Sequence, residues 1–566
     1  MSNTGTETKA QRVERLKREK NPWEGLDEIR RFAREGFGSI TPEWLGTYFR
    51  WWGVYTQGDG AGVVGGKNGE GKALPYFMVR IRIPGGLLRS DQLRTIAAVT
   101  ERYAKGTADL TVRQNIQLHW VTIESLPEVL DALWRAGLTT MGSCGDDTRN
   151  ITGCPLAGVD ADEICDASPL GLEANQFFVG NAEFYNLPRK FKICITGCKV
   201  WCAYPEINDV GLTAIRRAGD GSEIGYSLRV GGGLSTDPHL AVRLNAFVRQ
   251  HEVIPVLKGI AEIFRESEKL RENRERARLK FLFLKHGWTA DSFQHELEQR
   301  IGFRLEPAAE ERPPQDVYRD HVGIHQQKQP GYCYVGAAVL RGRITAPQMH
   351  AAADLSDRFA NGELRTTNMQ NLLIVNVPRQ NVDALASQLN SVGLLVAGSP
   401  FWRGAIACSG SEFCKLAITE TKSFSRWLVE ELEERLPGFD QHLKLHVTGC
   451  PNSCGQHWIA DVGIEGKKIK VGDRMVDAYY FCVGGAVGLH ESVARPIGYR
   501  CPASEVPDAI ERLLRRYLDE RLPGENLRRF FARYSDEELR ECVAGELVAA
   551  VARDPSPGQA PHVVEG

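Results

Sequence analysis

The sequence predicts an α+β protein made of two fused copies of one half, because a long internal repeat combines with alternating helical and strand patterns. Residues 102–106 read Arg-Tyr-Ala-Lys-Gly, and residues 358–362 read Arg-Phe-Ala-Asn-Gly. Residues 191–198 read Phe-Lys-Ile-Cys-Ile-Thr-Gly-Cys, and residues 443–450 read Leu-Lys-Leu-His-Val-Thr-Gly-Cys. A repeat of this length exceeds the period of a solenoid unit, so it indicates a duplication of a whole half-protein.

Within the first copy, a smaller module can be followed element by element. A helical pattern covers about 90–105, a strand pattern covers 116–123, and a second helical pattern covers about 127–136. Such alternation is typical of an α+β sandwich. Outside the repeat, residues 1–35 are charged and predicted to be helical, and the segment 546–566 is predicted to be disordered.

Composition excludes several classes of function. The length of 566 residues suggests three or more domains, and 42% hydrophobic with 25% charged residues is ordinary for a globular enzyme. A net charge of −2 implies no bulk attraction to nucleic acid or to an anionic membrane. No apolar run has the length of a membrane span, and the N-terminus carries no export signal, so we expect a cytoplasmic protein. Fourteen cysteines then favour metal or redox chemistry over disulfides.

Four of these cysteines form a pattern near the C-terminal third. Cys408 and Cys414 are spaced as Cys-x5-Cys, and Cys450 and Cys454 as Cys-x3-Cys. Four thiolates are the ligand set of a [4Fe–4S] cluster, and the glycine, serine and proline around them leave loops that can enclose it. Zinc is one alternative, although its cysteine pairs are usually closer in sequence. Four buried, unconnected thiols are another.

The pattern Cys-x5-Cys followed by Thr-Gly-Cys-Pro-Asn-x-Cys-Gly resembles the sirohaem-dependent nitrite and sulfite reductases, and the likeness runs from about Trp51 to about Arg495. It implies that the four cysteines bind a [4Fe–4S] cluster and that Cys454 is also the axial ligand of the sirohaem iron. It implies two ferredoxin-like half-domains and two larger α+β domains related by a pseudo-two-fold axis. The expected units are a charged helical lead-in (1–70), the first half-domain (71–140), a first sirohaem and substrate domain without a cluster (141–320), the second half-domain (321–397), the cluster and sirohaem domain (398–545) and the tail (546–566).

A small oxyanion substrate requires fixed cationic donors, and so do the carboxylates of sirohaem. Four basic residues lie in segments that resemble the active-site segments of the family, and the resemblance places them around the distal face of the sirohaem: Arg82, Arg149, Lys190 and Lys192. Lys190 and Lys192 are two residues apart, so in an extended segment both reach one face. The alternative for any single basic residue is a solvated surface charge.

Three further residues are candidates for binding the sirohaem beside Cys454: Arg113, Gln117 and Asn452. Arg80 or Arg102 are alternatives to the first two. Tyr55 and Cys144 occupy positions at which some members of the family carry a covalent tyrosine–cysteine link, and an ordinary buried tyrosine with a free thiol is the alternative. Cys198 and Cys202 repeat the Cys-x3-Cys spacing in the first copy. Because that copy has no Cys-x5-Cys, we expect it to have lost its metal and kept the fold.

The resemblance implies a reductase that converts sulfite to sulfide with six electrons. Lys192 favours sulfite, because this position is often asparagine in members that reduce nitrite, and the Tyr55 and Cys144 pair points the same way. Reduction of nitrite to ammonia is the alternative, since the motif around Cys408 and Cys414 occurs in both ferredoxin-linked groups. A non-catalytic sirohaem or cluster carrier is a third. No dinucleotide fingerprint is present, so we expect ferredoxin to supply the electrons to a monomeric enzyme.

Overall fold

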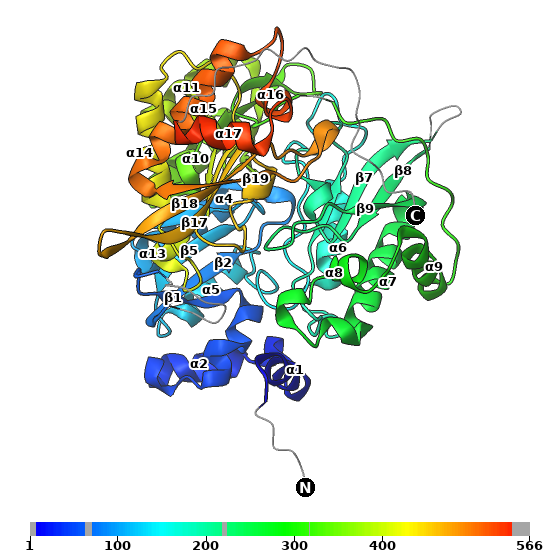
Figure 1. Ribbon diagram of the computed structural model, residues 1–566. Coiled ribbons are helices and arrows are strands. Elements are labelled where there is room, and N and C mark those ends of the chain that lie inside the picture. Colours follow the sequence, from blue (N-terminus) through cyan, green and yellow to red (C-terminus); the bar gives the residue numbers. More distant parts are fainter. Residues whose placement is uncertain (1–6, 63–70, 218–222, 316, 546–566) are drawn as a thin grey trace.

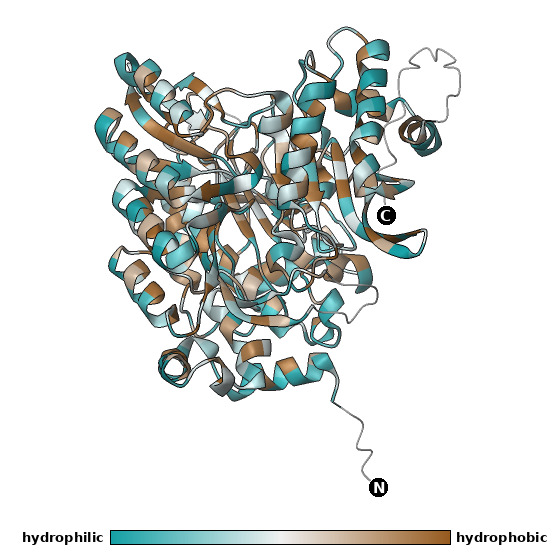
Figure 2. Cartoon of the chain, turned by 90° about the vertical axis from the view of Figure 1, so that its left-hand side faces the viewer, coloured by the Kyte–Doolittle hydropathy of each residue, from teal (hydrophilic) through white to brown (hydrophobic). Residues whose placement is uncertain are grey.

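The computed structural model describes residues 7–62, 71–217, 223–315 and 317–545, so the predicted disordered tail lies outside the described residues. The first larger domain, with β7 (Val210–Arg216), β8 (Ile224–Val230) and α7 (Val253–Glu266), lies to one side of the remaining domains in Figure 1. Hydrophobic residues, drawn in brown, are frequent in the strands of the interior, and hydrophilic residues, drawn in teal, are frequent in the outer helices (Figure 2). No helix in the described ranges combines the length and the apolar character needed to cross a membrane.

Two five-stranded sheets form the smaller modules, and each contains one strand from the other half of the chain. The first sheet runs in the order β1 (Val54–Gly58), β2 (Ala73–Ile81), β5 (Ile116–Val121), β4 (Thr107–Leu110), β12 (Arg343–Thr345). The second runs β10 (Gly323–Gln326), β11 (Tyr332–Ala337), β14 (Leu372–Pro378), β13 (Glu363–Thr366), β3 (Leu87–Arg89). The exchanged strands β12 and β3 pair antiparallel with β4 and β13, which joins the two halves.

Helices cover both small sheets and share one hydrophobic core. These helices are α4 (Ser90–Tyr103), α5 (Leu126–Arg135), α10 (Ala346–Phe359) and α11 (Val382–Ser391). Ile96 of α4 and Met349 of α10 are both fully buried in that core. The predicted strand and both predicted helices of the first module are confirmed to within two residues at each end.

The two larger domains share a strand arrangement. One sheet consists of β6 (Ile193–Thr196), β7, β8 and β9 (Val242–Arg249), and the other of β15 (Ala405–Ala407), β16 (Leu445–Thr448), β17 (Val462–Val471), β18 (Arg474–Val483) and β19 (Arg495–Pro502). The pairs β6·β7 and β16·β17 are parallel, and the strands that follow are antiparallel. The predicted duplicated α+β fold is therefore confirmed.

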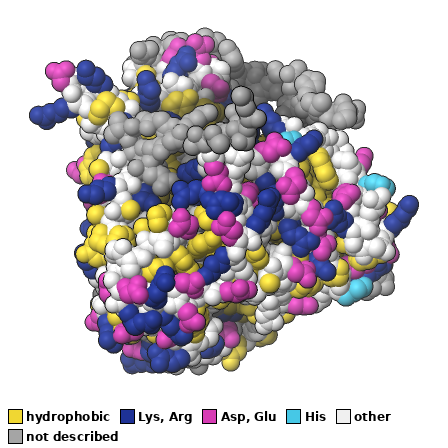
Figure 3. Space-filling view, turned by 90° about the horizontal axis from the view of Figure 1, so that it is seen from below, with side chains coloured by type: hydrophobic (Ala, Val, Ile, Leu, Met, Phe, Trp, Pro, Cys, Tyr) yellow, Lys and Arg dark blue, Asp and Glu magenta, His cyan; other side chains and the backbone are white. Residues whose placement is uncertain are grey.

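The N-terminal helices α1 (Lys9–Glu19) and α2 (Leu26–Glu35) lie beneath this body (Figure 1). Lys17 is fully buried, donates from Nζ to the carbonyl of Leu187 at 2.8 Å, and lies 3.5 Å from a carboxylate oxygen of Asp146. Around these helices basic and acidic side chains intermix over the lower surface (Figure 3). Helix α1 thus packs on two loops that carry candidate site residues.

Candidate active site

The four cysteines of the second half lie beyond the carboxyl ends of the neighbouring parallel strands β15 and β16. Cys408 directly follows β15, and Cys414 follows the short helix α13 (Gly410–Phe413). Gly410 has φ +61°, and a Cβ there would lie 2.5 Å from Oγ1 of Thr421. Only glycine allows the loop to turn this tightly beside its neighbour.

The electrostatics of these cysteines fit a cationic inorganic centre. Burial, and next the negative charge of Cys454, raises the pKa of Cys414 to about 12 and raises the pKa values of Cys408 and Cys450. A positive centre such as iron would compensate the charge of the thiolates of Cys408, Cys414 and Cys450 and so favour their ionised forms. The backbone N–H of Gly449 donates to Sγ of Cys408 at 3.3 Å, which further favours a thiolate.

Asn452 lies where the sequence predicts a cofactor contact. Its Nδ2 is 3.5 Å from Sγ of Cys450, within the same loop as Cys454. Cys454 is the exposed member of the four, whereas Cys450 is buried. The exposed sulfur is therefore the one that a second group can approach.

Lys190 and Lys192 provide cations toward this loop. Phe191 between them is fully buried in the core of the first larger domain, so the two lysines project to its other side. Neither ammonium group forms a hydrogen bond or ion pair with any described residue. Burial, followed by Arg278 and Arg189, lowers the pKa of Lys190 to about 7, and the charge of Cys454 opposes this shift. Lys190 thus lies within the electrostatic influence of Cys454, and an anionic ligand beside these two unpaired lysines would favour their protonated forms.

Burial, and then Lys190, also holds the pKa of Lys192 well below its usual range. The backbone N–H of Lys192 donates to Oδ2 of Asp209 at 2.8 Å, and Arg278 binds both carboxylate oxygens of Asp209 at 3.1 and 2.7 Å. Asp209 thus fixes the segment that carries the lysines, directly before β6. Within the repeat, Asp461 holds the backbone N–H of Lys444 in the same way, at 2.8 Å.

Arg149 and Arg113 lie in the same electrostatic environment, because the charge of Arg149 acts on the pKa values of Arg113 and Lys190, and the charge of Arg113 acts on the pKa of Lys192. Arg149 donates to the carbonyl of Gly145 at 2.7 Å. Arg113 donates to Asn208 and to the carbonyl of Asn150, each at 2.6 Å, while its buried Nε has no partner in the described structure. Both guanidinium groups are held by backbone and amide oxygens rather than paired with a carboxylate at hydrogen-bonding distance.

Gln117, Arg80 and Cys144 form a connected set. Gln117 accepts from Nε of Arg80 at 2.8 Å and donates to Oγ of Ser409, the neighbour of Cys408, at 3.1 Å. Arg80 also donates to Sγ of Cys144 at 3.0 Å. Burial, and next Cys144, raises the pKa of Tyr55, so Tyr55 and Cys144 share one buried environment. The set connects the first half-domain to the cluster loop.

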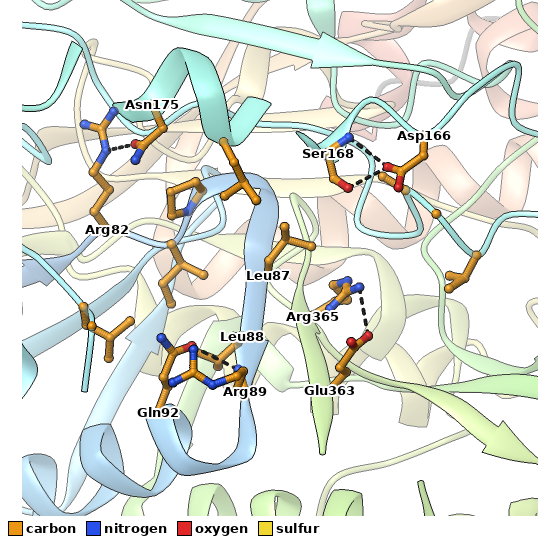
Figure 4. A pocket seen from close by; sticks show the side chains of 18 of the residues that line it. Arg82, Leu87, Leu88, Arg89, Gln92, Asp166, Ser168, Asn175, Glu363 and Arg365 are labelled. Carbon is orange, nitrogen blue, oxygen red and sulfur yellow. Dashed lines mark hydrogen bonds and ion pairs between the residues drawn. The ribbon is translucent and has the colours of Figure 1, made fainter. Parts of the chain in front are cut away.

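Arg82 is oriented differently from the other predicted cations. Its guanidinium donates to the carbonyls of Gly142, Thr148 and Arg149 at 2.8–3.0 Å and to the side chain of Asn175 at 2.6 Å. The bond to Asn175 borders a separate pocket of about 570 Å³ (Figure 4), which is not lined by any of the four cluster cysteines or by Lys190 or Lys192. Arg82 therefore positions the loop that carries Cys144 and Arg149, whereas Arg80 lies beside Cys144.

Paired substitutions separate these two roles. We expect Arg82→Met to lower the free energy of unfolding by roughly 3–5 kcal/mol, because three buried carbonyls lose their donor. Arg80 is half-buried, so Arg80→Met should cost less than about 1.5 kcal/mol while lowering turnover. Chemical denaturation and steady-state rates measure both effects. Equal stability of Arg82→Met and the wild-type protein would contradict the positioning role.

Several cations near the site were not predicted. Arg50 lies over the ring of Tyr55, 5.7 Å from its centroid, and Arg189 and Arg274 pair with Asp146. Arg189 directly precedes Lys190 in the segment Leu-Pro-Arg-Lys-Phe-Lys and was not assigned a role, whereas Arg50 and Arg274 occur in no recognisable motif. Asp209 could have been found, because Asp-Val-Gly recurs at 461–463 within the repeat.

Comparison with known proteins agrees with this geometry. Residues 144–305 and 399–550 match the family described as "Nitrite and sulphite reductase 4Fe-4S domain", and residues 70–135 and 325–392 match "Nitrite/Sulfite reductase ferredoxin-like half domain". The assimilatory ferredoxin-dependent nitrite reductase of Haloferax mediterranei is 37% identical over 536 residues, covering 89% of this chain and 88% of the relative. The ferredoxin-dependent sulfite reductase of Mycobacterium tuberculosis is 36% identical over 539 residues, covering 93% and 95%.

The solved structure of the Mycobacterium tuberculosis NirA protein superimposes with a TM-score of 0.88 at 35% identity, covering 93% of this chain and 97% of that one. The matches extend over both half-domains and both larger domains, so the predicted ferredoxin-like halves are confirmed. On this evidence, the chain belongs to the nitrite and sulfite reductase family of oxidoreductases.

Proposed function

We propose that this protein reduces sulfite to sulfide in the cytoplasm, using a sirohaem coupled through Cys454 to a [4Fe–4S] cluster. The observation that carries the proposal is a pair of lysines unpaired among the described residues, Lys190 and Lys192, of which Lys190 interacts electrostatically with Cys454 and Lys192 with Lys190. Relatives named as ferredoxin-dependent sulfite reductases support ferredoxin as the electron donor. We further propose that the protein acts as a monomer.

The residues divide the work in a defined way. When bound, the cluster and the sirohaem would pass on, one at a time, the six electrons that ferredoxin supplies. The side chains of Cys408, Cys414, Cys450 and Cys454 would hold these two cofactors. Arg149, Lys190 and Lys192 bind the oxygens of the oxyanion, and the lysine ammonium groups provide protons at Nζ as water leaves. Arg113, Gln117 and Asn452 bind the cofactor, and its carboxylates suit Arg113 in particular.

Reduction of nitrite to ammonia is the second candidate, because relatives named as nitrite reductases match about as well as the sulfite reductases. Lys192, together with the shared environment of Tyr55 and Cys144, favours sulfite. The deciding experiment is steady-state oxidation of reduced ferredoxin by anaerobically purified holoprotein, with sulfite and nitrite supplied separately. A larger kcat/KM for sulfite supports the proposal, and a larger value for nitrite replaces it. Sirohaem absorbance without turnover of either substrate would favour the carrier function.

The pKa of Lys190 predicts how activity depends on pH. A lysine binds an anion in its protonated form, which predominates below about pH 7 here, so kcat/KM should fall as pH rises through 7. Lys190→Arg keeps its charge and should move this descending limb to higher pH. Sulfite also titrates in this range, so the difference between the two pH profiles is the informative measurement. Superimposable profiles would contradict a role for the charge of Lys190.

A further inference from the structure

The first half of the chain contains a close counterpart of the cluster motif. Cys154 and Asp160 are separated by five residues, as are Cys408 and Cys414, and Cys198 and Cys202 repeat the Cys-x3-Cys spacing. The topology agrees, because Thr152 bridges β6 in parallel two residues before Cys154, as Ile406 pairs with β16 two residues before Cys408. Three of four cysteine positions are thus retained, and aspartate replaces the fourth.

The retained side chains lie close together in the interior. Sγ of Cys202 is 3.4 Å from Sγ of Cys154. The ligand atoms of Cys154, Cys202 and His321 all lie within 4.8 Å of one another, and so do those of Cys154, Asp160 and Cys198. Each of these five residues is at most 6% exposed. Cys154 is common to both groups, so all five residues belong to one buried cluster around it. Cys198 is not within 4.8 Å of both Cys202 and His321, so a shared centre requires a small movement of its side chain.

His321 gives an independent indication of a ligand. It is 3% exposed, and neither Nδ1 nor Nε2 has a hydrogen-bond partner within the described part of the chain. A buried imidazole with two unsatisfied nitrogens is costly, and a metal ion would satisfy one of them. No other residue in this cluster leaves such a donor or acceptor unused, because Asp160 accepts from Arg319 at 2.6 Å and from the N–H of Asp162 at 3.1 Å.

We propose that Cys154, Cys198, Cys202 and His321 bind one zinc ion. A tetrahedral zinc with Zn–S bonds of about 2.3 Å separates its sulfur ligands by roughly 3.8 Å, close to the distance between Cys154 and Cys202. A [4Fe–4S] core distributes four ligands over four irons, so its ligand sulfurs lie further apart. Accordingly, the four cluster cysteines form no comparably tight group among the described residues. Three cysteines and one histidine are a usual structural zinc set.

The groups next to the proposed zinc site fit the net charge expected of it. Three thiolates and Zn²⁺ carry one net negative charge, and Arg319, which pairs with Asp160 of this cluster at 2.6 Å, supplies a positive charge beside it. The backbone N–H of Val200 donates to Sγ of Cys198 at 3.3 Å, as backbone donors commonly do at metal-bound thiolates. The cysteines belong to the first larger domain, whereas His321 leads into β10 of the second half-domain. The zinc would therefore tie two domains together, independently of the substrate reduced.

Metal analysis of the anaerobically purified holoprotein tests the proposal, after gel filtration with a chelator. We expect about one zinc per chain, and X-ray absorption at the zinc edge should give three sulfur ligands and one nitrogen ligand. Cys202→Ser and His321→Gln should each lower the zinc content about tenfold or more, while sirohaem and cluster absorbance persist. Cys501→Ser is the matched control, because it removes a buried thiol of β19 that lies in neither group.

Three outcomes would overturn the proposal. These are wild-type protein without stoichiometric zinc, a Cys154–Cys202 disulfide in peptide mapping of unreduced native protein, and an iron count that requires a second cluster. If a variant fails to fold, the X-ray absorption spectrum of the wild-type protein at the zinc edge still tests the proposal, because it reports the sulfur and nitrogen ligands of the zinc directly. Sulfite and nitrite turnover play no part in these outcomes, so the zinc proposal and the proposed function fail separately.

Discussion

Lys192→Met is expected to lower kcat for sulfite by about 10²–10³-fold, equivalent to roughly 2.5–4 kcal/mol in the barrier, while both cofactors remain bound. Its side chain is half-buried, its ammonium group forms no ion pair with a described residue, and its pKa is affected by Lys190 more than by any other charge. Methionine keeps the length and the apolar contacts of the side chain and removes only the charge. The loss should therefore appear in turnover, measured with a viologen donor, and not in sirohaem absorbance.

Lys444→Met is the matched control for this variant. Lys444 occupies the equivalent position in the repeat, with a pKa lowered by burial and with the same carboxylate bond to its backbone N–H. It faces Tyr204 rather than the loop of Cys454, so its substitution should leave the rate within about threefold of wild type. An unchanged rate in Lys192→Met would remove Lys192 from the site. Equal losses in both variants would indicate a general effect of removing a buried lysine.

The sequence predicts the duplicated fold well because the repeat preserves hydrophobic periodicity over both halves. It does not reveal the exchange of β3 and β12 between the two small sheets. Each of these strands has three residues, and such short segments carry too little side-chain pattern to specify a partner. Their pairing depends on how the halves pack, which is a tertiary property. The same reason explains why the contact of Lys17 with Asp146 could not be predicted.

The candidate site was predictable where a motif carries it. The spacing required for cluster ligation indicates the cysteines, and the resemblance to the family's active-site segments, with a two-residue spacing, indicates Lys190 and Lys192. The structure adds that Phe191 between the lysines is buried. The resemblance located the segment of Arg82, but it could not show what the guanidinium contacts. Arg82 lies just beyond β2, where its backbone bridges Thr139, and its guanidinium donates to backbone carbonyls of the loop 142–149. A motif thus locates a segment, whereas the surrounding loops decide what each side chain binds.

Cys454→Ala is expected to remove [4Fe–4S] and sirohaem absorbance together and to lower turnover by more than about 10³-fold, because the cofactors carry the electron chemistry. The reason is a shared sulfur: the exposed Cys454 is proposed to bind both groups, whereas Cys414 serves only the cluster. Cys482→Ala, which removes a buried thiol of β18, should change neither absorbance nor rate. Iron content and visible spectra of the purified variants measure the outcome. Loss of the cluster with full retention of sirohaem would mean that the axial ligand is not Cys454, and Lys190 would then lie near a cluster sulfur alone.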